Sequence, residues 1–127
     1  MNYISCTFVA LGGVLGALSR YFVSTLVNSK YTSLIPWGTI TVNMLGCFFL
    51  GLVFTLSSKT LLISPNAKSF LAVGFLGAFT TFSTFSVETL SLLKGGNIGL
   101  ALLNSGGSVL LGLLAAWLGT LSAKLFI

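Results

Sequence analysis

Four long apolar stretches constrain the fold of this chain more than any other feature of its sequence. A helix needs about 20 apolar residues to cross the hydrocarbon layer of a bilayer. None of the stretches alternates as a membrane strand does, and only helices and closed barrels satisfy their backbone in lipid. The stretches cover residues 4–27, 35–56, 69–93 and 98–125. The sequence therefore predicts an all-α integral membrane protein with four transmembrane helices per subunit.

The charge content agrees with a membrane protein and excludes several other classes. Charged residues make up only 6% of the 127 residues, whereas a soluble domain has about a quarter. There is no histidine, and no nucleophile–base pair, phosphate-binding loop or dinucleotide motif is present. We therefore expect a single multi-pass domain spanning residues 1–127 in the cell membrane, without enzymatic activity.

The six basic residues divide evenly between the two sides of a four-span topology, in which both termini lie on the same side. The two groups are Lys59, Lys68 and Lys124 against Lys30, Lys94 and Arg20. Orientation in the membrane follows an excess of Lys and Arg on the cytoplasmic side, and here there is no excess. This balance predicts dual topology, and with it an antiparallel homodimer.

Residues 77–88 combine hydroxyl groups and phenylalanines inside an apolar stretch and end at Glu88, the only carboxylate side chain. Polar side chains at membrane depth are costly and usually functional. Phe82 and Phe85 are three residues apart and share a helix face. Because the edge of an aromatic ring carries positive charge, these edges could coordinate an anion. Packing against lipid or core is the alternative for both rings.

Residues 74–81, which overlap the start of this stretch, contain two glycines and end in two threonines. This composition predicts that the third helix is broken near mid-membrane. A break frees backbone carbonyl groups, which can bind a cation, and exposes amide groups that attract anions.

Polar residues on the other helices have two interpretations each. Asn43 either fixes helix packing through a hydrogen bond or donates from its amide to a passing anion. Arg20 either extends to lipid headgroups or provides a positive potential that concentrates anions. Asn104 and Ser108 lie four residues apart on one face of the last helix, where packing hydrogen bonds are the alternative to a role in a pathway.

Three motifs in chain order carry a resemblance to a known family. They are Gly12-Gly13-x-x-Gly16-Ala17-x-x-Arg20-Tyr21, Gly38-Thr39-x-x-Val42-Asn43-x-x-Gly46 and Gly77-x-x-Thr80-Thr81-Phe82-Ser83-Thr84-Phe85-Ser86-x-Glu88. Together they resemble the Fluc/CrcB fluoride channels over the whole chain. The resemblance implies a dual-topology antiparallel homodimer with two pores, which exports fluoride passively and relieves fluoride toxicity.

The resemblance also implies roles for particular residues. Phe82 and Phe85 would present ring edges to fluoride, and Asn43 would be the pore amide. Hydroxyls near the path would come from Thr81, Ser83, Thr84 and Ser108. Arg20 would be the vestibule arginine, and the backbone carbonyls of Gly77 and Thr80 would hold a structural sodium ion on the dimer axis. The chain departs from some members at Asn104, where they have an aromatic residue.

Two other classes of function remain open from the sequence. Small proton-coupled multidrug transporters also have four short spans and dual topology, but they need a carboxylate in the first span, and this chain has none there. A non-transporting structural or assembly subunit is the second alternative.

Overall fold

The computed structural model describes residues 3–127 and consists of helices joined by short connections. Four segments are long and apolar enough to cross a membrane: Tyr3–Lys30, Trp37–Lys59, Pro65–Lys94 and Ile98–Phe126. The prediction of an all-helical membrane protein with four spans is confirmed, and the chain is a multi-pass membrane protein. The predicted domain of residues 1–127 includes residues 1 and 2, which lie outside the described part of the chain.

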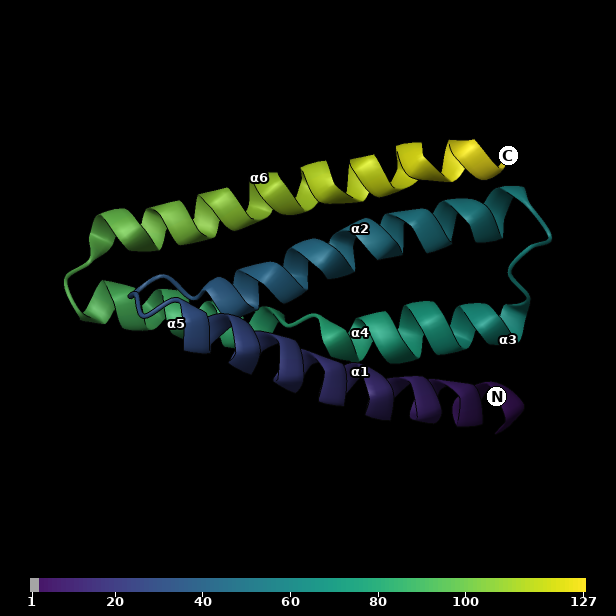
Figure 1. Cartoon of the computed structure of the whole chain (residues 1–127), viewed down its shortest axis with the longest axis horizontal. Helices are drawn as coiled ribbons and strands as arrows, with labels where there is room; N and C mark the ends of the chain where they lie inside the picture. The colour runs from purple at the N-terminus through teal and green to yellow at the C-terminus, as the bar shows by residue number, and fades with distance from the viewer. Residues whose placement is uncertain (1–2) are drawn as a thin grey trace.

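The segments run alternately along one long axis, so both chain ends lie at the same end of the molecule (Figure 1). Helix α1 (Tyr3–Lys30) packs mainly against the first half of the third segment, and α2 (Trp37–Lys59) packs mainly against α6 (Ile98–Ala123). A short 3₁₀ turn, η2 (Lys124–Phe126), follows α6. Each long helix thus has one main packing partner.

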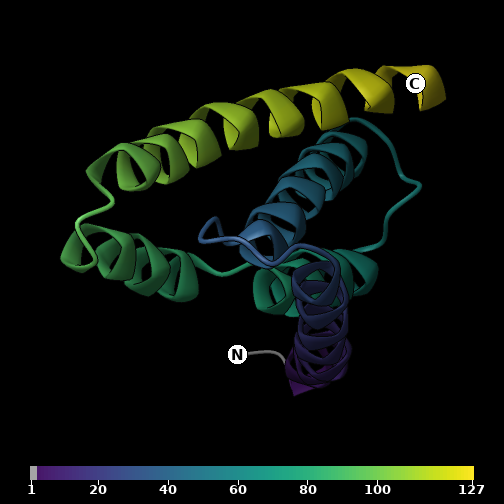
Figure 2. The same ribbon diagram turned by 60° about the vertical axis from the view of Figure 1, so that its left-hand side comes forward.

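The third segment is built from several pieces instead of one continuous helix. Helix α3 (Pro65–Lys68) leads into η1 (Ser69–Leu76), which is wound as a π-helix, and then into the short α4 (Gly77–Phe79). Thr80 and Thr81 are extended, with φ/ψ of −86°/161° and −151°/119°. Helix α5 (Phe82–Lys94) begins after them and lies well to the side of α4 in the rotated view (Figure 2).

Glycines let the helix backbones approach one another closely. A Cβ atom on Gly74 would lie 2.6 Å from the carbonyl oxygen of Val9, so α1 and η1 touch backbone to backbone. At the other main contact, Gly51 of α2 and Gly119 of α6 face backbone atoms of the opposite helix. Lipid provides little hydrophobic drive between helices, so close packing of small residues supplies the association.

The first connection differs from the sequence prediction. The first predicted stretch ends at residue 27, but α1 continues three residues further, to Lys30. Asparagine favours loops, but Asn28 lies within α1. Its side-chain oxygen accepts a hydrogen bond from the Gly38 N–H at 2.9 Å. This bond satisfies one of the free amide groups at the start of α2. A tertiary contact therefore outweighs the local preference of the residue.

Candidate ion pathway

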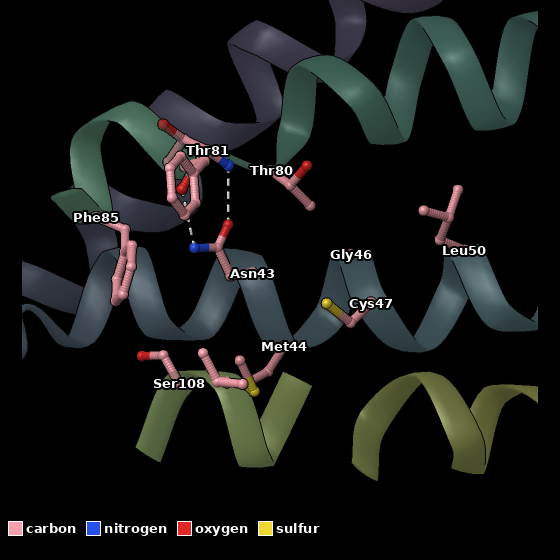
Figure 3. A pocket seen from close by; sticks show the side chains of 11 residues that line it. Asn43, Met44, Gly46, Cys47, Leu50, Thr80, Thr81, Phe85 and Ser108 are labelled. Carbon is pink, nitrogen blue, oxygen red and sulfur yellow. Dashed lines mark hydrogen bonds between the residues drawn. The ribbon is translucent and has the colours of Figure 1, made fainter. Parts of the chain in front are cut away.

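The interruption of the third segment is held by the side chain of Asn43 on α2. The Asn43 amide nitrogen donates to the Thr81 carbonyl at 3.0 Å, and the Thr81 N–H donates to the Asn43 side-chain oxygen at 2.8 Å (Figure 3). A side-chain amide has the same donor and acceptor groups as a peptide. Asn43 thus replaces the helical partners that Thr81 would otherwise have. One of its two amide hydrogens is used in this way, which leaves the other for a ligand.

Thr81 also begins α5 as its N-cap residue. Its hydroxyl oxygen accepts the N–H of Thr84 at 3.2 Å and donates to the Thr84 hydroxyl at 2.9 Å. The Ser83 hydroxyl lies 3.4 Å from the same oxygen. An N-cap of this kind satisfies an amide group that has no helical partner. The three predicted hydroxyls therefore form one cluster at the start of α5, with Ser83 and Thr84 on its exposed side.

A pocket of about 270 Å³ opens beside this interruption. It is lined by six of the predicted residues, Asn43, Thr80, Thr81, Phe82, Phe85 and Ser108. Asn43 and Thr81 come from α2 and the interruption, while Ser108 comes from α6 and faces the space below Phe85 (Figure 3). The rest of the lining is largely apolar and includes Met44, Cys47 and Leu50. Segments distant in sequence thus bring an amide, hydroxyls and aromatic rings to one cavity.

The two phenylalanines form a pair at the mouth of the pocket. Their ring centroids are 5.8 Å apart and the rings are tilted by 43°. Phe82 is 80% exposed in the single subunit, whereas Phe85 is half-buried. The pocket is therefore open on the side where Phe82 lies.

The structure places the predicted cation ligands and Arg20 close to the interruption. Gly77 itself is helical, with φ/ψ of −62°/−36°, and the extended residues are Thr80 and Thr81. In a continuous helix the Gly77 carbonyl would accept from the Thr81 N–H, but that N–H donates to Asn43. In the same way the Thr80 carbonyl would accept from the Thr84 N–H, which donates to the Thr81 hydroxyl. Arg20 donates to the Thr80 carbonyl at 3.4 Å.

Two released carbonyl oxygens are suitable donors for a hard cation, and unwound helices use such carbonyls to bind sodium. Gly77 is also on the exposed face of the subunit. The two-fold axis of a homodimer at this point would bring four carbonyl oxygens together, two from each subunit. The donor chemistry therefore fits the predicted sodium ion, although the Arg20 guanidinium already shares the Thr80 carbonyl.

Two further polar contacts join α5 to its neighbours. Thr39 of α2 donates to a Glu88 carboxylate oxygen at 2.8 Å, and Asn104 of α6 donates from its amide to the Thr89 hydroxyl at 2.8 Å. Thr39 and Thr89 were not among the predicted site residues. The four-residue spacing of Thr39 and Asn43, which puts both on one face of α2, is a signal that could have identified Thr39.

These features define a class: a four-span membrane protein whose third segment is interrupted beside a pocket of polar and aromatic groups. Comparison with known proteins makes the class specific. Residues 7–120 match the family described as CrcB-like protein, Camphor Resistance (CrcB). The chain belongs to this family.

Curated relatives cover nearly the same length as this chain. It is 50% identical over 118 residues to a protein of Magnetococcus marinus, covering 93% of this chain and 96% of the relative. It is 53% identical over 111 residues to a protein of Thermus thermophilus, covering 87% and 88%. Both relatives are named fluoride-specific ion channel FluC. The relatives are thus ion channels by name, which is a non-enzyme class.

Proposed function

We propose that this chain is a passive fluoride channel that exports fluoride from the cytoplasm through two pores of an antiparallel, dual-topology homodimer in the cell membrane. The observation that carries the proposal is the pocket at the helix interruption, which combines the Asn43 amide, the Phe82 and Phe85 rings and the Ser108 hydroxyl. The FluC names of relatives that are 50–53% identical support fluoride as the ion.

The chemistry of the pocket suits a small anion. Fluoride holds its water strongly, so a pore must replace that water with several donors at once. The free amide hydrogen of Asn43, the hydroxyls and the positive ring edges are donors of this kind. None of the described residues that line the pocket is acidic, so the lining itself adds no negative charge. Arg20 adds positive charge at the interruption and serves as the vestibule arginine in this proposal.

The surface around the interruption favours a second copy as the missing wall. Ser83, Thr84 and Gly77 are exposed beside the 80%-exposed Phe82. Hydroxyl groups facing lipid are unfavourable, whereas a partner subunit would cover them and close the open side of the pocket. An antiparallel arrangement agrees with the lysines in the last turns of α1, α2 and α5, because these turns lie at both ends of the molecule.

The proposal includes a structural sodium ion held by the carbonyls of Gly77 and Thr80 from both subunits. When bound, the ion would offset the partial negative charge of four carbonyl oxygens at the subunit contact. We expect the purified dimer to dissociate more readily when sodium is replaced by a large organic cation. Cross-linking or light scattering would measure this, and equal dimer stability in both salts would contradict the sodium site.

Substitution of the two phenylalanines tests the site. We expect Phe82→Ile and Phe85→Ile each to reduce fluoride efflux from proteoliposomes sharply, since isoleucine is apolar but lacks a positive ring edge. Phe126→Ile, in the C-terminal turn far from the pocket, is the matched control and should retain wild-type efflux. Wild-type efflux from both pocket variants would count against the assigned site.

A further inference from the structure

Helix α5 carries both phenylalanines of the pocket but is weakly anchored by apolar contacts. Leu92 is its one buried residue, whereas Val87, Leu90 and Leu93 are exposed. Its position within the subunit therefore depends strongly on side-chain hydrogen bonds. Besides the Asn43–Thr81 pair at its start, these are the contacts from Thr39 to Glu88 and from Asn104 to Thr89.

The Asn104 contact continues to the backbone of Phe85. Asn104 donates from its amide nitrogen to the Thr89 hydroxyl oxygen at 2.8 Å, and Thr89 donates its own hydroxyl hydrogen to the Phe85 carbonyl at 2.8 Å. A hydroxyl has a single hydrogen and two lone pairs, so both bonds can exist together. A chain of two hydrogen bonds thus joins α6 to the turn of α5 that carries a pocket ring.

Apolar packing alone does not explain an asparagine at position 104. It is only 3% exposed, and its side-chain oxygen has no hydrogen-bond partner among the described residues. An unsatisfied buried carbonyl is costly. Asn104 lines an adjoining cavity of about 180 Å³, and the other lining residues include Leu100, Leu103 and Leu111. The amide donor is the feature that a leucine would lack.

We propose that Asn104 is a positioning residue that acts through Thr89 to hold the Phe85 turn of α5 and thereby sets how well the pore discriminates fluoride from larger anions. The inference rests on the proposed function, because it assigns selectivity to the same pocket. Asn104 itself does not line that pocket. It acts on the ion through the position of the ring.

Three variants isolate the effect: Asn104→Leu, Thr89→Val and the two combined. Leucine and valine are close in size to the residues that they replace, so the fold should be retained. Loss of one net hydrogen bond corresponds to a change of about fivefold in the population of the correctly placed ring. We expect the fluoride-to-chloride efflux ratio to fall about fivefold in each single variant. The fall should be the same in the double variant, because all three variants break the same hydrogen bond.

Two controls separate positioning from general damage. Thr89→Ser keeps the hydroxyl and should retain the wild-type ratio. Ser105→Ala, next to Asn104 on α6, removes a hydroxyl that bonds within α6, to the Leu102 carbonyl. This variant should also leave the fluoride-to-chloride efflux ratio unchanged.

A second measurement reports the ring position without ion flux. Fluorinated phenylalanine placed at position 85 should change its ¹⁹F resonance in Asn104→Leu, while the same probe at position 75 should not. An unchanged resonance at position 85 together with a wild-type efflux ratio would overturn the inference. If the wild-type protein conducts no fluoride, the proposed function fails, while a resonance change confined to position 85 would still support the positioning role.

Discussion

At the scale of single residues, Asn43 explains why the interruption has one defined shape. Its carboxamide pairs with both backbone groups of Thr81, as a neighbouring strand would. The bonds join residues 38 positions apart, so they also fix α2 against the start of α5. Both interpretations of Asn43 drawn from the sequence are compatible with this geometry, because one amide hydrogen holds the backbone and the other is available to an ion.

Substitution of Asn43 should therefore affect stability as well as conduction. We expect Asn43→Leu to leave the N–H and C=O of Thr81, a buried residue, without partners, at a cost of about 1–3 kcal/mol for each group. Unfolding in detergent, followed by circular dichroism, would measure the loss. Met44→Leu, a change of similar volume at the adjacent lining position, should cost much less. Equal stability of the two variants would show that the Asn43 bonds contribute little.

At the scale of elements, the interruption was only partly predictable. Glycines and β-branched threonines in residues 74–81 indicate a weak helix, and the chain does leave helical geometry at Thr80 and Thr81. The prediction covered residues 74–81 as a whole, and only the last two of them leave helical geometry, while Gly77 is helical. The exact position depends on the Asn43 side chain and on Thr81 as an N-cap, and local composition contains no information about a partner 38 residues away.

Other contacts were beyond prediction for the same reason. Spacing within one helix indicates which residues share a face, as it did for Phe82 and Phe85, whose rings pair. It does not indicate which face of another helix lies opposite, so the Thr39–Glu88 and Asn104–Thr89 pairs could not be derived. The π-helical winding of η1 also has no local signal that we can identify.

The contact between α1 and η1 offers an element-scale test with adjacent glycines. A Cβ at Gly12 would lie 2.8 Å from the Phe75 nitrogen and 3.1 Å from the Gly74 Cα, whereas a Cβ at Gly13 meets nothing within 4 Å. We expect Gly12→Ala to destabilise the subunit by about 1–3 kcal/mol through overpacking. Gly13→Ala should be neutral or stabilising by up to about 1 kcal/mol, because alanine favours helix.

Thermal unfolding of the two variants in the same detergent would compare them directly. If Gly12→Ala were as stable as Gly13→Ala, the close crossing of α1 and η1 would be wrong.

At the scale of the whole molecule, the position of Arg20 changes the charge balance. By its place in the sequence Arg20 belongs with Lys30 and Lys94, but its guanidinium lies at the interruption and contacts the Thr80 carbonyl. The end that holds both termini has Lys59, Lys68 and Lys124, so three lysines oppose two. The difference is still a single charge, which leaves dual topology as our expectation.

Reporters fused to the C-terminus would test the orientation. We expect a reporter active only inside the cell and one active only outside to give comparable signals for the wild-type chain. Removing two charges with Lys30→Gln and Lys94→Gln should move the C-terminus to the cytoplasmic side, whereas Lys59→Gln with Lys68→Gln should move it outward. Activity of only one reporter with the wild-type chain would contradict dual topology.

The proposed function requires that this chain conduct fluoride without any other protein. The most direct measurement is efflux from liposomes that contain only the purified protein, followed with a fluoride electrode and, in parallel, a chloride electrode. We expect rapid fluoride efflux, far above that from empty liposomes, with little chloride efflux. Fluoride efflux no faster than from empty liposomes, or chloride efflux equal to that of fluoride, would contradict the proposed function.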